Sequence, residues 1–237
     1  MKNEDIFSTD VEKVLPALKL ELKRLSTIWL PRERSGNGEA GRLLENELGI
    51  EENNRDEADI PIGDLKAVTR TTKTTLFSKE GPLLLPREEI YERFGFYGKK
   101  HQLSLQTAVN SSPNGQHFSY HCEVDGVYLS CHNVDIQFWN WDLLIKSFTA
   151  KFPAVFTVHY RTKTVNGIEH FKFTNAYYFP SLETTVNSFV SAFKEGNVTI
   201  EVRRYMSSST SERNRGTAFR VNHQTFNQIF QTRQTII

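Results

Sequence analysis

The segment Asp59-Ile-Pro-Ile-Gly-Asp64-Leu-Lys66 constrains this chain more than any other part of its sequence. Asp64 and Lys66 are separated by one residue, so on a β-strand their side chains project from the same face. Asp59 has the opposite parity, and in an extended chain it would lie about 17 Å from Asp64, too far to share an ion. The chain must therefore turn between the two aspartates, and Pro61 and Gly63 are residue types that permit a turn.

Two carboxylates beside a lysine are the groups that metal-dependent hydrolysis of a phosphodiester requires. Mg²⁺ prefers hard oxygen ligands, lowers the pKa of a bound water and neutralises charge on the transition state. Lys66 would contact the scissile phosphate and help to position or deprotonate the water. Glu45, in a predicted helix upstream, could join as a further metal ligand. A surface hairpin with an Asp–Lys pair is the alternative interpretation, because the spacing alone is loose.

Length and composition bound the class of protein. A chain of 237 residues, with 38% hydrophobic and 24% charged residues, can form one large globular domain or two small lobes around a cleft. No apolar run is long enough to cross a membrane, and the polar N-terminus does not resemble a signal peptide. With only two cysteines, the chain is expected to be cytoplasmic and to have no membrane partner.

The net charge of +1 hides an uneven distribution. Residues 45–64 contain eight acids and one base, whereas residues 197–237 contain six Arg and two Glu. A metal site and a DNA-binding surface would produce this asymmetry. Two solvated surfaces of opposite sign would produce it equally well, so charge alone does not decide between them.

Hydrophobic spacing and turn residues predict a mixed α/β chain with a mainly antiparallel central region. The predicted helices are 9–29, 38–48, 86–94, 139–152, 181–195 and 223–231. The predicted strands are 60–69, 74–78, 103–109, 118–124, 127–131, 154–162, 170–179, 198–206 and 217–221, with hairpin turns at Asp125-Gly126 and Asn166-Gly167.

Beyond the Asp/Lys core, two separated stretches resemble the MvaI/BcnI-type, MutH-like restriction endonucleases. The first contains Gly41-Arg-Leu-Leu-Glu45, then the core, then Thr75-Leu-Phe77, matching the family's Gly-x-x-x-Glu helix, D-x4-E-x-K core and Thr-Leu-Phe strand. The second, Arg215-Gly-Thr-Ala-Phe-Arg220-Val, resembles the C-terminal recognition segment. Two matches in family order, over a similar total length, are more specific than either alone.

The resemblance implies a restriction-endonuclease-like core, a mixed β-sheet flanked by helices, with two lobes around a DNA-binding cleft. Residues 1–100 would form mainly the catalytic lobe and residues 101–237 mainly the DNA-recognition lobe, with a soft boundary. It implies a monomeric type II restriction endonuclease that hydrolyses duplex DNA with Mg²⁺ at a short GC-rich site, of the CCWGG kind. A DNA methyltransferase acting on the same site is the expected functional partner.

The resemblance also assigns roles by position. Asp59, Asp64 and Lys66 match the catalytic core and Glu45 the helix-borne acid, which makes the three acids the expected metal ligands. The residues that match base-reading positions are Glu201, Arg203 and Arg220. The predicted DNA-recognition set also includes Arg213, Arg215 and Ser78. The chemistry agrees, because Arg can hold guanine O6 and N7 and Glu can accept from cytosine N4.

This chain departs from the family pattern at three places. Asp64 stands where the family usually has Glu, and Arg213-Asn214 replace a His-Asp pair. Ser78 and Ala218 replace two histidines of BcnI-type members, which slightly favours an A·T central pair. Two alternatives remain open: a MutH-like, sequence-dependent nicking endonuclease, and a DNA-binding relative that has lost catalysis through Asp64.

Overall fold

The structure is a computed structural model that describes residues 4–36, 38–51, 57–69, 71, 73–98, 102–208 and 211–237. Part of the acidic stretch, residues 52–56, lies outside the described residues. The chain forms two compact units: unit 1 comprises residues 1–72, 149–185 and 230–237, and unit 2 comprises residues 73–148 and 186–229. Residues 73–100, expected before the soft boundary, therefore belong to unit 2.

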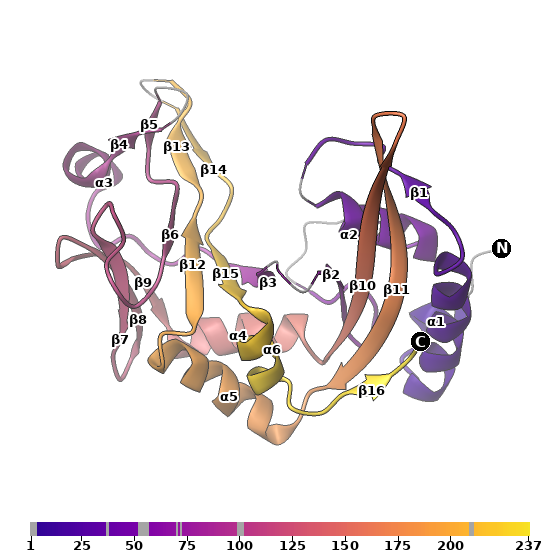
Figure 1. Ribbon diagram of the computed structural model, residues 1–237. Helices are drawn as coiled ribbons and strands as arrows, with labels where there is room; N and C mark the ends of the chain where they lie inside the picture. The colour runs from indigo at the N-terminus through magenta and orange to yellow at the C-terminus, as the bar shows by residue number, and fades with distance from the viewer. Residues whose placement is uncertain are drawn as a thin grey trace. The chain divides into compact units, whose positions relative to one another are not determined.

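Unit 1 is built on a five-stranded sheet in which β1, β11, β10 and β2 lie in that order and β16 pairs with β11. Strand β10 pairs antiparallel with β11 and parallel with β2 (Figure 1). The elements are η1 (Glu4–Phe7), α1 (Val11–Leu25), β1 (Leu30–Pro31), α2 (Glu39–Leu48), β2 (Asp64–Val68), β10 (Ala154–Val165), β11 (Ile168–Pro180) and β16 (Gln234–Thr235).

Helix α1 covers one face of this sheet. Its apolar stripe packs against that face, where Leu18 and Leu22 share a buried cluster with Phe156 and Phe173. The Asp10 carboxylate caps the helix by accepting a hydrogen bond from the backbone N–H of Glu12 (3.0 Å). The opposite face of the sheet is therefore the one left for polar side chains.

Two predicted turns of unit 1 are confirmed. Helix α2 ends at Gly49, which adopts φ 79° and hydrogen-bonds back to the last helical turn. Strands β10 and β11 are joined at Asn166 and Gly167, with φ values of 51° and 78°. Two consecutive positive φ values are typical of the tight hairpin turn that Asn-Gly predicts.

Unit 2 contains three small sheets, ordered β3-β15-β12-β6, β14-β13-β5-β4 and β7-β8-β9. Their strands are β3 (Thr74–Ser78), β4 (Phe96–Tyr97), β5 (Leu103–Ser104), β6 (Thr107–Val109), β7 (Phe118–Cys122), β8 (Gly126–Cys131), β9 (Val134–Asn140), β12 (Val198–Val202), β13 (Arg204–Met206), β14 (Glu212–Asn214) and β15 (Ala218–Val221). The helices are α3 (Arg87–Phe94) and α6 (His223–Ile229), while α4 (Trp141–Lys151) and α5 (Glu183–Lys194) contribute to both units along the chain. Its core is aromatic, with Phe219 packed against Phe77, Trp139 and Phe193.

The mixed α/β class is confirmed, but one predicted helix begins too early. Trp139 belongs to strand β9, which the sequence analysis missed, and its indole is fully buried. Helix α4 begins at Trp141, after Asn140 accepts a hydrogen bond from the backbone N–H of Leu143 (2.7 Å). The Trp139 indole N–H donates to Lys79 O (3.0 Å), a long-range bond that holds this segment as a strand.

Two predicted strands are each split. Residues 103–109 form β5 and β6, which lie in different sheets. Residues 198–206 form β12 and β13, because the chain changes sheets at Arg203, whose carbonyl accepts a hydrogen bond from Arg215 N–H (3.1 Å). Strand β14 and the two-residue strands β1, β4 and β16 were also not predicted. None of the described helices is long and apolar enough to span a membrane.

Candidate active site

The predicted turn before Asp64 is confirmed. The backbone N–H of Ile60 donates to Gly63 O (3.1 Å), and Gly63 N–H donates to Ile60 O (3.0 Å). A side chain at Gly63 would place its Cβ 2.6 Å from the carbonyl oxygen of Ala154, so only glycine fits against β10 here. The turn brings Asp59 back to β2, where its Oδ2 accepts a hydrogen bond from Leu65 N–H (2.8 Å).

Asp64 and Lys66 project from the same face of β2, as their spacing predicts. The Lys66 Nζ lies 2.6 Å from Asp64 Oδ2. Between them, Leu65 packs into the core cluster under α1, so the Asp–Lys pair lies on the opposite face. The Asp64 side chain is fully buried, whereas Lys66 retains 20% of its side-chain surface. Lys66 is therefore the member of the pair that solvent or a substrate can reach.

A second lysine completes this cluster, and the sequence analysis missed it. Lys151 lies at the end of α4, and its Nζ is 2.6 Å from Asp64 Oδ1 and 3.4 Å from Asp59 Oδ1. It also donates to the carbonyl of Glu57 (2.8 Å). No local spacing links Lys151 to the motif. The connection is the parallel pairing of β2 with β10, which aligns Asp64 with Val155 just after α4.

Burial and the neighbouring charges act in opposite directions in this cluster. Burial raises the pKa of Asp64 above its ordinary value, although Lys66 and Lys151 oppose the shift. Burial alone would lower the pKa of Lys151, but the carboxylates of Asp64 and Asp59 outweigh it and leave that pKa raised. Lys151 therefore stays protonated and offsets carboxylate charge that would otherwise be buried alone.

The donor set fits a hard divalent cation. Both Asp64 oxygens are buried, and neither accepts a hydrogen bond of regular geometry from a described residue. The Lys151 ammonium lies within ion-pair distance of both Asp59 and Asp64, so a cation at that position would meet two carboxylates. Among the described residues no three His, Cys, Asp or Glu side chains form a metal-binding group. Glu45 of α2 therefore does not form such a group with Asp59 and Asp64.

A second cluster forms on the sheet β3-β15-β12-β6 of unit 2. Ser78 pairs with Ala218, and Ala218 pairs with Glu201, so these residues form one row across three strands. The Arg220 Nη1 donates to Glu201 Oε2 (3.1 Å), and Arg203 Nη2 donates to Ser78 Oγ (2.7 Å). Four predicted DNA-recognition residues, far apart in sequence, are therefore brought together.

The remaining two predicted recognition residues lie elsewhere in unit 2. Arg213 is in β14, opposite Tyr205 of β13, and Arg215 follows that strand; both side chains are exposed. Glu201 and Arg203 were expected to share one strand, but β12 ends between them, so strand parity does not place them on one face. Arg203 reaches the cluster instead by donating to Gly216 O (2.7 Å) and to Ser78.

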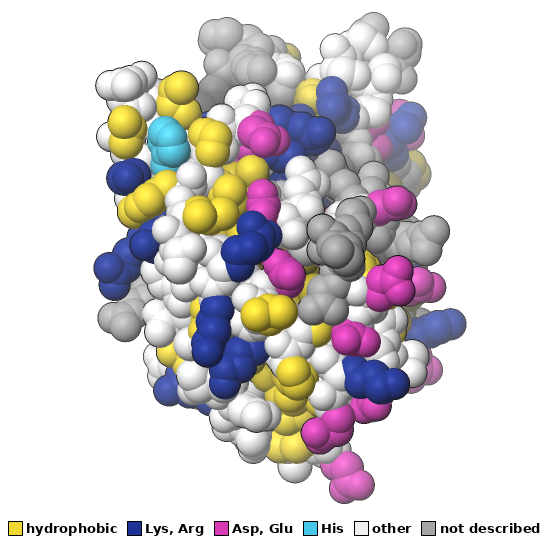
Figure 2. All heavy atoms as spheres, turned by 90° about the vertical axis from the view of Figure 1, so that its right-hand side faces the viewer, with side chains coloured by type: hydrophobic (Ala, Val, Ile, Leu, Met, Phe, Trp, Pro, Cys, Tyr) yellow, Lys and Arg dark blue, Asp and Glu magenta, His cyan; other side chains and the backbone are white. Residues whose placement is uncertain are grey.

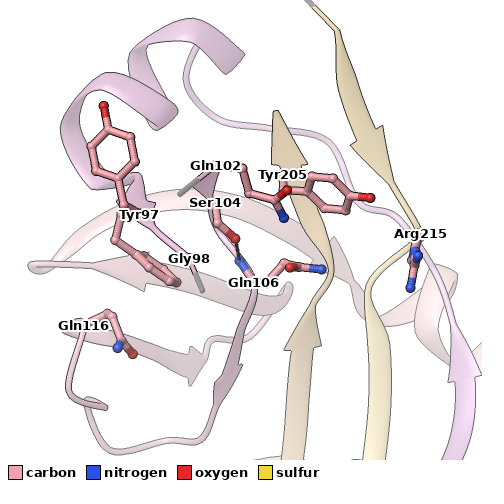
Figure 3. Close-up of a pocket in the computed structure, with 9 residues that line it drawn as sticks. Tyr97, Gly98, Gln102, Ser104, Gln106, Gln116, Tyr205 and Arg215 are labelled. Carbon is pink, nitrogen blue, oxygen red and sulfur yellow. Dashed lines mark hydrogen bonds between the residues drawn. The ribbon is translucent and has the colours of Figure 1, made fainter. Parts of the chain in front are cut away.

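Unit 2 also has an open pocket of about 600 Å³. Its described lining residues are Phe96, Tyr97, Gly98, Gln102, Ser104, Gln106, Gln116, Tyr205 and Arg215 (Figure 3). Arg215 is the charged residue of this described lining, which contains no carboxylate. The pocket therefore offers aromatic and amide surfaces for binding, whereas the cluster of carboxylates and lysines described above belongs to unit 1.

Comparisons with known proteins agree with this geometry. The structure matches a chain described as "Restriction endonuclease MvaI-cognate DNA substrate complex", with a TM-score of 0.79, 20% identity, and coverage of 94% of this chain and 98% of that one. A second match, "Restriction endonuclease MvaI in the absence of DNA", has a TM-score of 0.53, 19% identity, and coverage of 97% and 99%. No curated protein matches this chain.

The fold is thus that of a restriction endonuclease. The profile of the MvaI/BcnI restriction endonuclease family matches residues 20–230. The chain belongs to this family, as the two separated sequence matches indicated, and is accordingly a nuclease that acts on DNA.

Proposed function

We propose that this protein is a type II restriction endonuclease that hydrolyses duplex DNA with Mg²⁺ at a short GC-rich site of the CCWGG kind. The observation that supports the proposal most is the cluster of Asp59, Asp64 and Lys66 on one face of the unit 1 sheet. When bound, Mg²⁺ would polarise the scissile phosphate and lower the pKa of an attacking water.

The residues of the cluster have separable roles in this proposal. Asp59 and Asp64 would hold the cation, and Glu45 of α2 would add a further ligand, either directly or through water. Lys66, the more exposed partner of Asp64, contacts the scissile phosphate and positions the water. Its ammonium lies 5.7 Å from the centre of the Phe152 ring, a cation–π contact that restricts where the lysine can point.

Recognition is assigned to unit 2. Arg220 and Arg203 would each hold guanine O6 and N7, and Glu201 would accept from cytosine N4. The Arg220 side chain retains 31% of its surface beside Glu201, so it is open to a base edge. Ser78, beside Ala218, would lie near the central base pair, and Arg213 and Arg215 would contact the DNA backbone or neighbouring bases.

Unit 1 would thus be the catalytic lobe and unit 2 the recognition lobe. We further propose that the enzyme is a cytoplasmic monomer and that a DNA methyltransferase protects the same site in the host chromosome.

The decisive experiment is a time course on supercoiled plasmid with Mg²⁺, with EDTA in a parallel reaction. Discrete linear fragments that require the metal are expected, and sequencing their ends would give the site. Lys66→Ala should leave the plasmid intact, whereas Lys19→Ala, on the far face of unit 1, should cut like the wild type. Nicked circles alone would indicate the nicking alternative. Intact plasmids of varied sequence in both Mg²⁺ and Mn²⁺ would indicate a DNA binder that does not cut.

A further inference from the structure

The β10–β11 hairpin has a polar face that the roles above do not use. Strand β2 pairs only with residues 155–159 of β10, and the hairpin continues beyond it to the turn at Asn166 (Figure 1). On the core side of the hairpin, Tyr160 faces Phe173 and Thr162 faces Phe171. The side chains between these positions therefore project from the opposite face, the one that bears Asp64 and Lys66.

That face bears two rows of basic side chains. Arg161 lies directly opposite Lys172, and Lys163 lies directly opposite His170. Arg161 and Lys163 are exposed, and the described residues place no carboxylate in an ion pair with Arg161, Lys163 or Lys172. Like charges directly opposite on a sheet are destabilising, so this arrangement costs free energy in the isolated protein.

Trp29 holds the lysines in place. Its ring lies just before β1, whose Leu30 pairs with Phe171 on the far side of β11. The Nζ of Lys163 is 4.3 Å from the ring centre, and that of Lys172 is 5.9 Å away. A cation–π contact favours each ammonium but supplies no negative charge. Two ammonium groups are thus kept together over one ring, a preorganised site for an anion.

The acidic residue nearest along the strand faces away. Glu169 lies on the core side of the hairpin, where its carboxylate forms an ion pair with Arg32 (2.5 Å). Figure 2 shows the face of unit 1 that bears α1, where both basic and acidic side chains are present. Among the described residues, the hairpin face thus carries basic side chains that form no ion pair with a carboxylate.

We propose that Arg161, Lys163, His170 and Lys172 form a phosphate-binding track that holds the backbone of duplex DNA beside the active site. The inference rests on the proposed function and extends it. Arg161, the first residue of the track, lies four residues beyond Thr157, the partner of Lys66, on the same face of β10, so the track extends the face that bears Lys66. Its two rows are about 6.6 Å apart, which spans about two nucleotides at a rise of 3.4 Å each.

The test is the salt dependence of binding to two duplexes, one with and one without the cleavage site, in EDTA so that no cutting occurs. Arg161→Ala with Lys163→Ala removes two contacts. The slope of log K against log [salt] should become shallower by about 1–2, and affinity at 0.1 M salt should fall about ten- to sixty-fold. Because phosphates carry no sequence information, both duplexes should lose affinity equally.

The matched control is Lys19→Ala with Lys23→Ala on α1, the same loss of charge on the opposite face. It should leave the slope unchanged, and Arg161→Lys with Lys163→Arg should retain the wild-type slope. Should alanine disturb the hairpin, Arg161→Gln with Lys163→Gln keeps the side-chain length and must show the same loss. A wild-type slope in both neutral variants, or an equal change of slope in the control, would rule out the phosphate-binding track but leave the proposed function standing. Failure of the wild type to bind any duplex would overturn the proposed function as well.

Discussion

The charged clusters of the two units differ in how deeply their side chains are buried. In unit 1, the fully buried Asp64 lies between two lysines whose side chains retain 20% and 14% of their surface. In unit 2, Glu201 and Arg220 form a single pair, with 35% and 31% of their side-chain surface exposed. The first cluster is enclosed by protein, whereas the second is half open to solvent.

This difference shows how each cluster can be used. A buried charge depends on its partners, because leaving it unpaired costs several kcal/mol. A half-exposed pair is only weakly held and can exchange its partner for a base edge at little cost. The unit 1 cluster is thus suited to holding fixed charges for chemistry, and the unit 2 cluster to reversible reading of a partner.

Lys66→Ala or Asp59→Ala should produce the largest effect. Cleavage should fall by about 10³-fold or more, because a group that stabilises charge in the transition state is lost. Binding to duplex DNA, measured by fluorescence anisotropy, should stay near the wild-type value. A variant of Lys66 that cuts at the wild-type rate would show that the active site lies elsewhere.

Lys151→Met should test whether the buried cluster needs its second cation. Without metal, the free energy of unfolding should fall by about 2–4 kcal/mol, because Asp59 and Asp64 lose a shared partner. Mg²⁺ should then raise the Tm of the variant more than that of the wild type, since the ion meets less positive charge. Lys19→Met is the surface control. Equal Mg²⁺ effects on both proteins would count against a cation position shared with Lys151.

Arg220→Ala should weaken binding to the cognate duplex by about 1–3 kcal/mol, the usual value of a bidentate guanine contact. Binding to a duplex without the site should change much less. Competition binding with the two duplexes measures this ratio directly. An equal loss on both would mean that Arg220 contacts phosphate, which would remove the contrast between the two clusters.

Glu39→Gln should have the smallest effect and concerns a pair that supports the fold of unit 1 alone. Its hydrogen-bonded partner Arg42 lowers the pKa of Glu39 from 4.5 to about 2. A carboxyl whose pKa is lowered on folding stabilises the fold fully at pH values above its ordinary pKa. This stabilisation is lost as the pH falls towards 2. The variant should therefore lose about 1–2 kcal/mol at neutral pH.

Urea unfolding of wild type and Glu39→Gln between pH 7 and pH 3 measures this difference, with Glu12→Gln on the exposed start of α1 as control. The difference in unfolding free energy between wild type and Glu39→Gln should narrow as the pH falls below the ordinary pKa of a Glu carboxyl. A gap that does not change with pH would show that packing, and not charge, makes Glu39 stabilising.

Much of the fold was predictable because it depends on neighbours in sequence. Strand geometry placed Asp64 and Lys66 on one face, and the odd offset of Asp59 required the turn that Gly63 makes. The Asn166-Gly167 hairpin and the α2 stop at Gly49 follow from backbone preferences of single residues. The missed strand β9 shows the limit, because the buried indole of Trp139 fits a strand and a helix start equally well by sequence.

The sequence by itself determined the family, the motif and the local direction of its side chains, since these depend on residue type and short spacing. Only the tertiary structure brought Lys151 to Asp64, because that contact needs the parallel pairing of β2 with β10. It alone placed Ser78 beside Ala218 and Arg161 opposite Lys172 across a hairpin. Such contacts depend on which strands pair and in which register, and the packing of distant segments decides both.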